Sequence, residues 1–334
     1  MTESHAARPI DSAAIARAAE VLTRGGLVAF PTETVYGLGA DASNPTAVRA
    51  IFAAKGRPAD HPVIVHVTDA GALDTWAREV PPAARRLAAR FWPGPLTLVL
   101  KRAACVDDAV TGGQDTVGLR CPAHPWARAL LAAFGGALAA PSANRFGRIS
   151  PTTAAHVRAD LGDRVDLILD GGACPVGIES TIVDLSGPAT RLLRPGSITR
   201  TQIEAELGQP VPDAGPDAPR ASGRLEQHYA PSTPVELVPA GALAARVNAL
   251  RGERLAVLAP AAALLDRPAQ VVARLLAPTA ASEYGRRLYA LLHELDATGA
   301  VRILIAEPPA GPDWDAVQDR LRRAAATQEM PHSL

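Results

Sequence analysis

Short apolar runs alternate with amphipathic stretches along the first part of the chain. An amphipathic segment begins near Ser12, and residues 27–30 follow it with the pattern of a buried strand. A second amphipathic segment starts at Asn44-Pro45, an N-cap followed by proline at the first helical position, and stops near Lys55-Gly56. Residues 63–67 predict the next strand. This alternation of helices and strands favours an α/β fold.

The same alternation continues as far as residue 208. Ser150-Pro151 repeats the cap-and-proline signal and predicts a helix that ends near Gly162, and Thr199 with Gln202 predicts a capping box. A further helix is predicted at 126–134, and further strands at 96–100, 116–120, 137–140, 165–169, 181–185 and 191–194. Residues 1–208 therefore predict one mixed α/β domain of roughly 200 residues, a usual size for one core.

The composition changes after residue 208. QPVPDAGPDAPRASG, residues 209–223, contains four prolines and almost no large apolar side chains, so residues 209–230 are predicted to form a linker or an ordered arm. Strand patterns then recur at 234–238, 254–258 and 301–306, and Tyr284, Leu288, Leu292 and Leu295 mark a helix. Residues 231–334 are thus predicted to form a second, small parallel α/β domain.

Charge and cysteine usage narrow the functional classes. The 34 basic residues balance 34 acidic ones, and aromatic residues make up only 4% of the chain, so strong direct binding of nucleic acid is not expected. The three cysteines have no metal-site spacing. No stretch has the length or apolarity of a signal peptide's core or a membrane span, so a cytoplasmic location without membrane attachment is expected.

Candidate chemistry lies in polar clusters at the predicted strand ends, where α/β folds gather ligands. The common phosphate-loop, dinucleotide and hydrolase signatures are missing. Taken singly, each cluster has an ordinary explanation: His66 between valines suits a core histidine, and Ser150 suits a helix cap. Arg57 and Arg120 stand out, because an arginine beside apolar strand residues needs an anionic partner.

Taken together and in order, the clusters resemble a known family. PTETVYGLGADA, KGRP, HPVIVHV, FWPGPLTLVL, TVGLRCPAHP, APSANRFGRISPT, GIESTIVDL and LLRPGSIT span residues 27–198, and this series resembles the YrdC-like family. FWPGPLT and PSAN are its most specific segments. HYAP at 228–231 and the α/β pattern beyond it resemble the two-domain branch, the L-threonylcarbamoyl-AMP synthases.

The resemblance implies a fold and an activity. The fold would be a YrdC-like twisted mixed-sheet domain followed by a small Rossmann-like parallel α/β domain. The activity would be that of a nucleotidyltransferase that makes threonylcarbamoyl-AMP and pyrophosphate from L-threonine, bicarbonate or CO2, and ATP. The product would pass to the tRNA threonylcarbamoyl-transferase machinery for threonylcarbamoyladenosine modification, and Mg²⁺ would accompany ATP.

The family pattern also assigns roles to individual residues. Lys55 and Arg57 would be catalytic and would grip the triphosphate. Tyr229 would fold over the nucleotide as part of a lid, and no residue is assigned to a metal. L-threonine would be held by Thr34, His66, Arg120, Ala140 and Ser180. ATP would be held by Lys55, Arg57, His61, Thr116, Ser142, Asn144, Ser150, Arg194 and Tyr229.

Three alternatives remain open at this point. An RNA-binding YrdC-like protein without synthase activity is disfavoured by the neutral charge and the few aromatics. A carbamoyl-transfer enzyme with another acceptor is disfavoured because the cysteine pairs of the hydrogenase-maturation type do not occur. A non-catalytic paralogue is disfavoured by the intact KGRP and PSAN segments.

Overall fold

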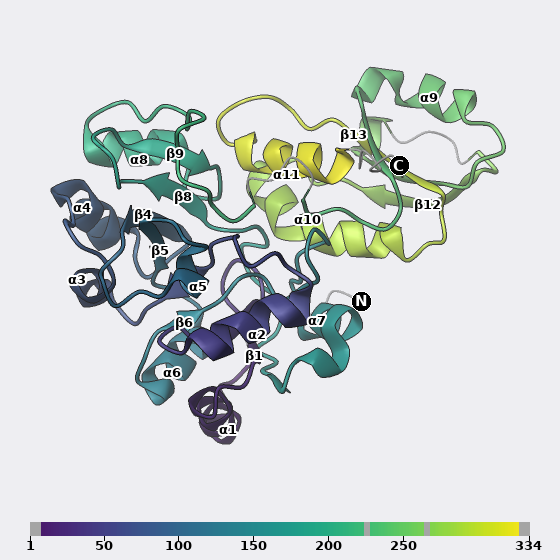
Figure 1. Cartoon of the computed structure of the whole chain (residues 1–334). Coiled ribbons are helices and arrows are strands. Elements are labelled where there is room, and N and C mark those ends of the chain that lie inside the picture. Colours follow the sequence, from purple (N-terminus) through teal and green to yellow (C-terminus); the bar gives the residue numbers. More distant parts are fainter. Residues whose placement is uncertain (1–7, 224–227, 264–267, 327–334) are drawn as a thin grey trace, which may run out of the picture. The chain divides into compact units, whose positions relative to one another are not determined.

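The computed structural model describes residues 8–223, 228–263 and 268–326 (Figure 1). The chain divides into two compact units, one of residues 1–146 and 150–224, the other of residues 147–149 and 225–334. Of the predicted linker, residues 224–227 lie outside the described part. No helix among the described residues is both long and apolar enough to cross a membrane.

The first unit is built on a nine-stranded mixed sheet in the described part of the chain, in the order β7-β1-β2-β6-β3-β5-β4-β8-β9. Neighbours β1/β7, β3/β5 and β4/β8 run parallel, and the remaining pairs run antiparallel. The strands are β1 Val28–Phe30, β2 Gly37–Asp41, β3 Ile64–His66, β4 Leu96–Lys101, β5 Thr116–Arg120, β6 Leu138–Ala139, β7 Leu167–Ile168, β8 Thr181–Asp184 and β9 Arg191–Arg194. The predicted mixed sheet is confirmed.

The helices of this unit follow the expected start and stop signals in most places. Asn44 caps α2 through its side chain, Gly56 ends α2 in the left-handed region (φ 61°), and Thr199 and Gln202 form the predicted capping box of α8. The helices are α1 Ser12–Thr23, α2 Pro45–Lys55, α3 Leu73–Trp76, α4 Pro82–Phe91, α5 Asp108–Thr111, α6 Pro125–Phe134, α7 Ala154–Leu161 and α8 Arg200–Leu207.

Several local predictions in this unit were wrong or incomplete, and helices α3, α4 and α5 were not predicted. The N-cap of α7 is Thr153, not Ser150, because α7 begins only at Ala154 and the Thr153 side chain accepts from the N–H of His156. The Ser150 hydroxyl donates to the Glu179 carboxylate. Strand β2 was not predicted, because its glycine-rich GLGAD sequence has little intrinsic strand preference and forms a strand only through its neighbours β1 and β6.

The two faces of the sheet are covered differently. On one face, helices α2, α4, α7 and α8 pack on the main apolar core. On the other face, α1 and α6 cover β1 and β6, whereas residues 214–221 of the arm pack on Val99, Ile182 and Leu193 of β4, β8 and β9. The strands between these two covers carry the polar side chains described below.

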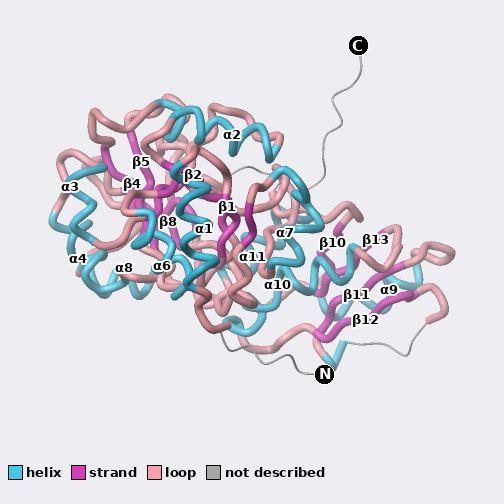
Figure 2. Tube along the Cα trace, turned by 90° about the horizontal axis from the view of Figure 1, so that it is seen from below, coloured by secondary structure: helices cyan, strands magenta, loops and turns pink. Residues whose placement is uncertain are grey.

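The second unit has an all-parallel four-stranded sheet in the described residues, ordered β10-β13-β11-β12 (Figure 2). Its strands are β10 Val235–Val238, β11 Leu255–Ala259, β12 Val271–Leu276 and β13 Arg302–Ala306, and its helices are α9 Leu243–Ala249, α10 Ala281–Asp296 and α11 Asp315–Ala325. The predicted small parallel α/β domain is confirmed. Strand β12 was not predicted, because residues 272–276 are only half-buried or exposed and lack a continuous apolar run.

Candidate functional site

Strand alternation brings His66 and Arg120 to one face of the first sheet. Val65 of β3 and Leu119 of β5 point into the main core. Because successive side chains alternate, His66 and Arg120 point to the opposite face, and they lie directly opposite each other in the β3/β5 register. The two residues that seem isolated in sequence are therefore neighbours.

Arg120 lies in a buried electrostatic cluster. Its Nη2 lies 2.7 Å from Oε1 of Glu33, and both side chains are at least 93% buried. Burial, followed by the positive charge of Arg120, lowers the pKa of His66 to about 3, so this imidazole is neutral at physiological pH. Within the described residues, Nδ1 of His66 and Nε of Arg120 have no hydrogen-bond partner. These two buried nitrogen atoms, on neighbouring strands, are therefore available to form hydrogen bonds with a ligand.

The other residues predicted to hold L-threonine lie in the same buried region. The hydroxyls of Thr34 and Thr32 share a hydrogen bond of 2.8 Å. The backbone N–H of Ala140 donates to the carbonyl of Ile64, two residues before His66 in the chain. The sequence analysis did not identify Glu33 as a site residue. Its position in the PTET segment, between Thr32 and Thr34, could have indicated it.

Ser180 links two groups of predicted residues. Its hydroxyl lies 2.7 Å from the hydroxyl of Thr97, and both residues are fully buried. Arg194 donates from Nη2 to the Ser180 hydroxyl at 3.2 Å and from Nε and Nη2 to the Ser180 carbonyl at 3.0 and 2.8 Å. The sequence analysis did not identify Thr97 as a site residue. Its position in the family-specific FWPGPLT segment could have indicated it.

Lys55 holds the loop that contains the PSAN segment. Its Nζ donates to the backbone carbonyls of Ser142, at 2.5 Å, and of Asn144. The Asn144 side chain donates to the carbonyl of Arg145 at 2.8 Å, and the N–H of Phe146 donates to the carbonyl of Lys55 at 2.9 Å. Burial, followed by the charge of Arg57, lowers the pKa of Lys55 well below its usual range.

Arg57 and His61 share an aromatic neighbour. The Arg57 guanidinium lies 5.9 Å from the centre of the Phe146 ring, and the His61 ring meets the same ring edge-on at 5.3 Å. Nη2 of Arg57 donates to the carbonyl of Pro62 at 2.8 Å and to the hydroxyl of Ser222 at 3.4 Å. Burial, followed by the charge of Arg57, lowers the pKa of His61 and favours its neutral form.

Ser150 is fully buried and donates to Oε1 of Glu179 at 2.6 Å. The donor therefore meets a charged acceptor, which makes the bond stronger than one between neutral groups. The prediction that Ser150 contacts ATP remains a prediction.

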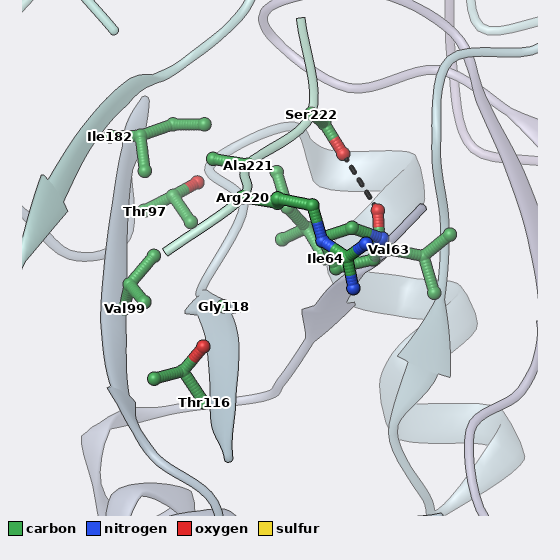
Figure 3. A pocket seen from close by; sticks show the side chains of 11 residues that line it. Val63, Ile64, Thr97, Val99, Thr116, Gly118, Ile182, Arg220, Ala221 and Ser222 are labelled. Atoms are coloured by element: carbon green, nitrogen blue, oxygen red, sulfur yellow. Dashed lines mark hydrogen bonds between the residues drawn. The ribbon is translucent and has the colours of Figure 1, made fainter. Parts of the chain in front are cut away.

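Thr116 lies on the part of the sheet that the arm covers. Arg220, Ala221 and Ser222 run across β3, β4 and β5 and leave a cavity of about 20 Å³ (Figure 3). The Ser222 hydroxyl donates to the Pro62 carbonyl at 3.0 Å, and its own carbonyl accepts from Nη1 of Arg194 at 2.9 Å. Because this space holds about one water, the arm fills the pocket in this conformation.

Tyr229 belongs to the second unit, whereas the residues above belong to the first. It has a positive φ of 63°, a strained region for a bulky residue, and its ring packs at 5.6 Å from Tyr289 and at 5.3 Å from the Arg320 guanidinium. His228 stacks edge-on against it at 4.1 Å. Several neighbours therefore fix this unusual conformation.

The chain matches two family models. Residues 20–196 match the Sua5_yciO_yrdC model, described as "Telomere recombination", and residues 198–326 match the Sua5_C model, described as "Threonylcarbamoyl-AMP synthase, C-terminal domain".

Relatives and solved structures agree with these matches. A threonylcarbamoyl-AMP synthase of Pyrococcus abyssi is 40% identical, with 92% of this chain and 93% of that protein covered. The Bacillus subtilis protein of the same name is 47% identical, with 67% and 66% covered. The crystal structure of P. abyssi Sua5 complexed with L-threonine superposes with a TM-score of 0.86 at 38% identity and covers 95% of this chain and 96% of that one. The chain belongs to the Sua5_yciO_yrdC family, in the branch that carries the Sua5 C-terminal domain.

Proposed function

We propose that the protein is a threonylcarbamoyl-AMP synthase, a nucleotidyltransferase that joins L-threonine, bicarbonate or CO2, and ATP into threonylcarbamoyl-AMP and pyrophosphate. The name shared by relatives that match most of the chain supports the activity, and the L-threonine complex of a close structural neighbour supports the amino acid.

The proposal rests mainly on the buried pair of Arg120 and His66, which suits the binding of an amino acid. A guanidinium is a planar, bidentate donor that suits a carboxylate, and Nε of Arg120 has no partner in the described structure. Neutral His66 beside it provides a polar contact without a second positive charge. An α-amino acid fits this combination, with Thr34, Ala140 and Ser180 as the remaining contacts.

The cations around the PSAN loop suit the nucleotide. Lys55, Arg57 and Arg194 donate to backbone carbonyls in this structure, and phosphate oxygens are stronger acceptors than carbonyls. His61, Thr116, Ser142, Asn144 and Ser150 are the further proposed contacts of ATP. The contact of Tyr229 with ATP stays a prediction.

The reaction needs positioning and charge neutralisation rather than a covalent nucleophile. The amine of L-threonine attacks CO2 and loses its proton, which gives a carbamate. A carbamate oxygen then bonds to the α-phosphorus of ATP while the bond from that phosphorus to the bridging oxygen breaks, and pyrophosphate leaves. Lys55 and Arg57 would neutralise the charge that builds on the triphosphate.

Mg²⁺ is proposed only as a companion of ATP. Among the described residues, no group of three or more histidine, cysteine or acidic side chains is arranged to hold a metal ion. The ion would therefore be bound largely by phosphate and water oxygens. We further propose that the adenylate is handed to the tRNA threonylcarbamoyl-transferase machinery in the cytoplasm.

The experiment is pyrophosphate release from ATP and bicarbonate, with L-threonine, with L-serine and without amino acid. We expect release that requires an amino acid, favours L-threonine over L-serine, and falls at least tenfold in Arg57→Ala. ATP binding without threonine-dependent release would point to another acceptor. Absence of ATP binding would refute the proposal and return attention to RNA binding, which a salt titration with RNA would then test.

A further inference from the structure

Glu33 is a buried carboxylate inside a region that otherwise suits an anionic ligand. It lies next to Arg120, and in the proposed function the substrate's own carboxylate occupies that place. A second carboxylate so close would ordinarily repel the carboxylate of the ligand in a poorly solvated site. Its position therefore needs an explanation.

The geometry of the contact provides one. Oε1 of Glu33 lies 2.7 Å from Nη2 of Arg120, yet neither atom forms a hydrogen bond with correct directionality within the described structure. The other carboxylate oxygen, Oε2, accepts a hydrogen bond from the backbone N–H of Ala123 at 3.0 Å. Glu33 is thus held by the backbone and supplies charge to Arg120, while the N–H groups at Nε and Nη2 remain available.

The backbone fixes Glu33 from both sides. Its carbonyl accepts from the N–H of Val176 at 2.8 Å, and its side chain is 93% buried. Since Arg120 ends strand β5 and Ala123 follows it closely, a single loop places both partners of the carboxylate. A residue anchored in this way can orient the guanidinium without moving when a ligand enters.

We propose that Glu33 is a positioning residue for the amino-acid substrate: it balances the charge of Arg120 and leaves the guanidinium donors for the ligand. The site then presents one cation, one anion and one neutral imidazole, so it selects a zwitterionic α-amino acid over a simple anion. This inference rests on the proposed function, since it takes the amino acid to bind at Arg120.

The test is L-threonine binding by calorimetry without ATP, together with steady-state kinetics, for wild type and Glu33→Gln. Loss of the charge should weaken L-threonine binding and raise its KM by roughly 10- to 100-fold, while the KM for ATP stays within about twofold. The uncompensated Arg120 should also attract simple anions. Sulfate should therefore become a competitive inhibitor against L-threonine in Glu33→Gln but not in wild type.

Two further variants separate charge from packing. Glu33→Asp keeps the charge but retracts it, so it should weaken L-threonine binding without gaining sulfate inhibition. Asp184→Asn removes another buried carboxylate of the same sheet, one that accepts from Ser186, and should leave both properties unchanged. If Glu33→Gln does not fold, the Glu33→Asp result alone decides.

Unchanged L-threonine affinity in Glu33→Gln, or in Glu33→Asp where that variant decides, would overturn the proposal. Equal rises in both KM values, or no gain of sulfate inhibition in Glu33→Gln, would overturn it as well. Calorimetry also separates this failure from a failure of the proposed function. Wild type that binds L-threonine but releases no pyrophosphate would contradict the synthase reaction and leave the role of Glu33 intact.

Discussion

Replacing Thr97 by valine tests whether the hydroxyl of Ser180 is held in place for the substrate. The Thr97 and Ser180 hydroxyls are 2.7 Å apart in a fully buried environment. Arg194 already donates to the Ser180 oxygen at 3.2 Å. The proton of Ser180 is therefore directed either to Thr97 or, when Thr97 donates, towards a ligand.

The expected magnitudes follow from this geometry. Valine keeps nearly the same volume, so Thr97→Val creates almost no cavity and loses one buried hydrogen bond, about 1 kcal/mol of unfolding free energy. Thr97→Ser keeps the hydroxyl and loses one buried methyl group, also about 1 kcal/mol. The two variants are thus matched in stability and differ in the hydroxyl that contacts Ser180.

Urea denaturation measures the stability of both variants, and steady-state kinetics with saturating ATP measures the KM for L-threonine. We expect Thr97→Val to raise that KM about fivefold, the equivalent of 1 kcal/mol, and Thr97→Ser to leave it within about twofold of wild type. Equal effects of the two variants on KM, or no effect of either, would show that the Thr97 hydroxyl does not orient Ser180 for the substrate.

Three further predictions address protonation, loop anchoring and the arm. Because burial lowers the folded-state pKa of His66 to about 3 from an ordinary 6.5, its stabilising contribution is full above pH 6.5 and is lost as the pH falls towards 3. Urea denaturation between pH 7 and 4 should therefore show a smaller loss of stability in His66→Gln than in wild type, and parallel curves would contradict this. Lys55→Met removes the donor to the carbonyls of Ser142 and Asn144. We expect it to lower the free energy of unfolding by about 1–3 kcal/mol in urea denaturation and to raise the KM for ATP. An unaltered KM would mean that the loop anchored by Lys55 does not contribute to nucleotide binding. Arg220→Ala removes the hydrogen bond to the Gly112 carbonyl. It should speed proteolysis within residues 214–222 while the thermal unfolding midpoint stays nearly unchanged. An unchanged cleavage rate would argue against anchoring of the arm by Arg220.

Local patterns predicted most elements of the first unit because strong signals mark their ends. The cap of α2 at Asn44 and the capping box of α8 lie where the sequence indicates them. Strand β2 escaped prediction because its glycines become a strand only between β1 and β6, and such pairing is not encoded within the segment. The cap at Ser150 was wrong because α7 begins later, at Ala154, where the side chain of Thr153 accepts from the N–H of His156.

The candidate site shows the same limit. Arg120 could be singled out from its apolar surroundings, whereas only the family resemblance assigned His66 to the same ligand. Glu33 and Thr97 could not be identified in this way, because their importance depends on partners that are 87 and 83 positions away in the chain. Contacts of this kind depend on the register between strands, which short-range periodicity does not determine.

In the proposed function, the partners of the cations explain how a neutral chain can suit a highly charged substrate. Lys55, Arg57 and Arg194 are at least 92% buried, and burying a charge without good partners would cost several kcal/mol. Backbone carbonyls at Pro62, Ser142 and Ser180 reduce this cost and carry no formal charge, so the region stays cationic. A triphosphate that enters would exchange these carbonyl contacts for charge-assisted bonds, with little reorganisation of the sheet itself. The binding energy would then come from replacing weak acceptors with strong ones. This exchange requires Ser222 of the arm to give up its hydrogen bonds with Arg57 and Arg194 when the nucleotide binds.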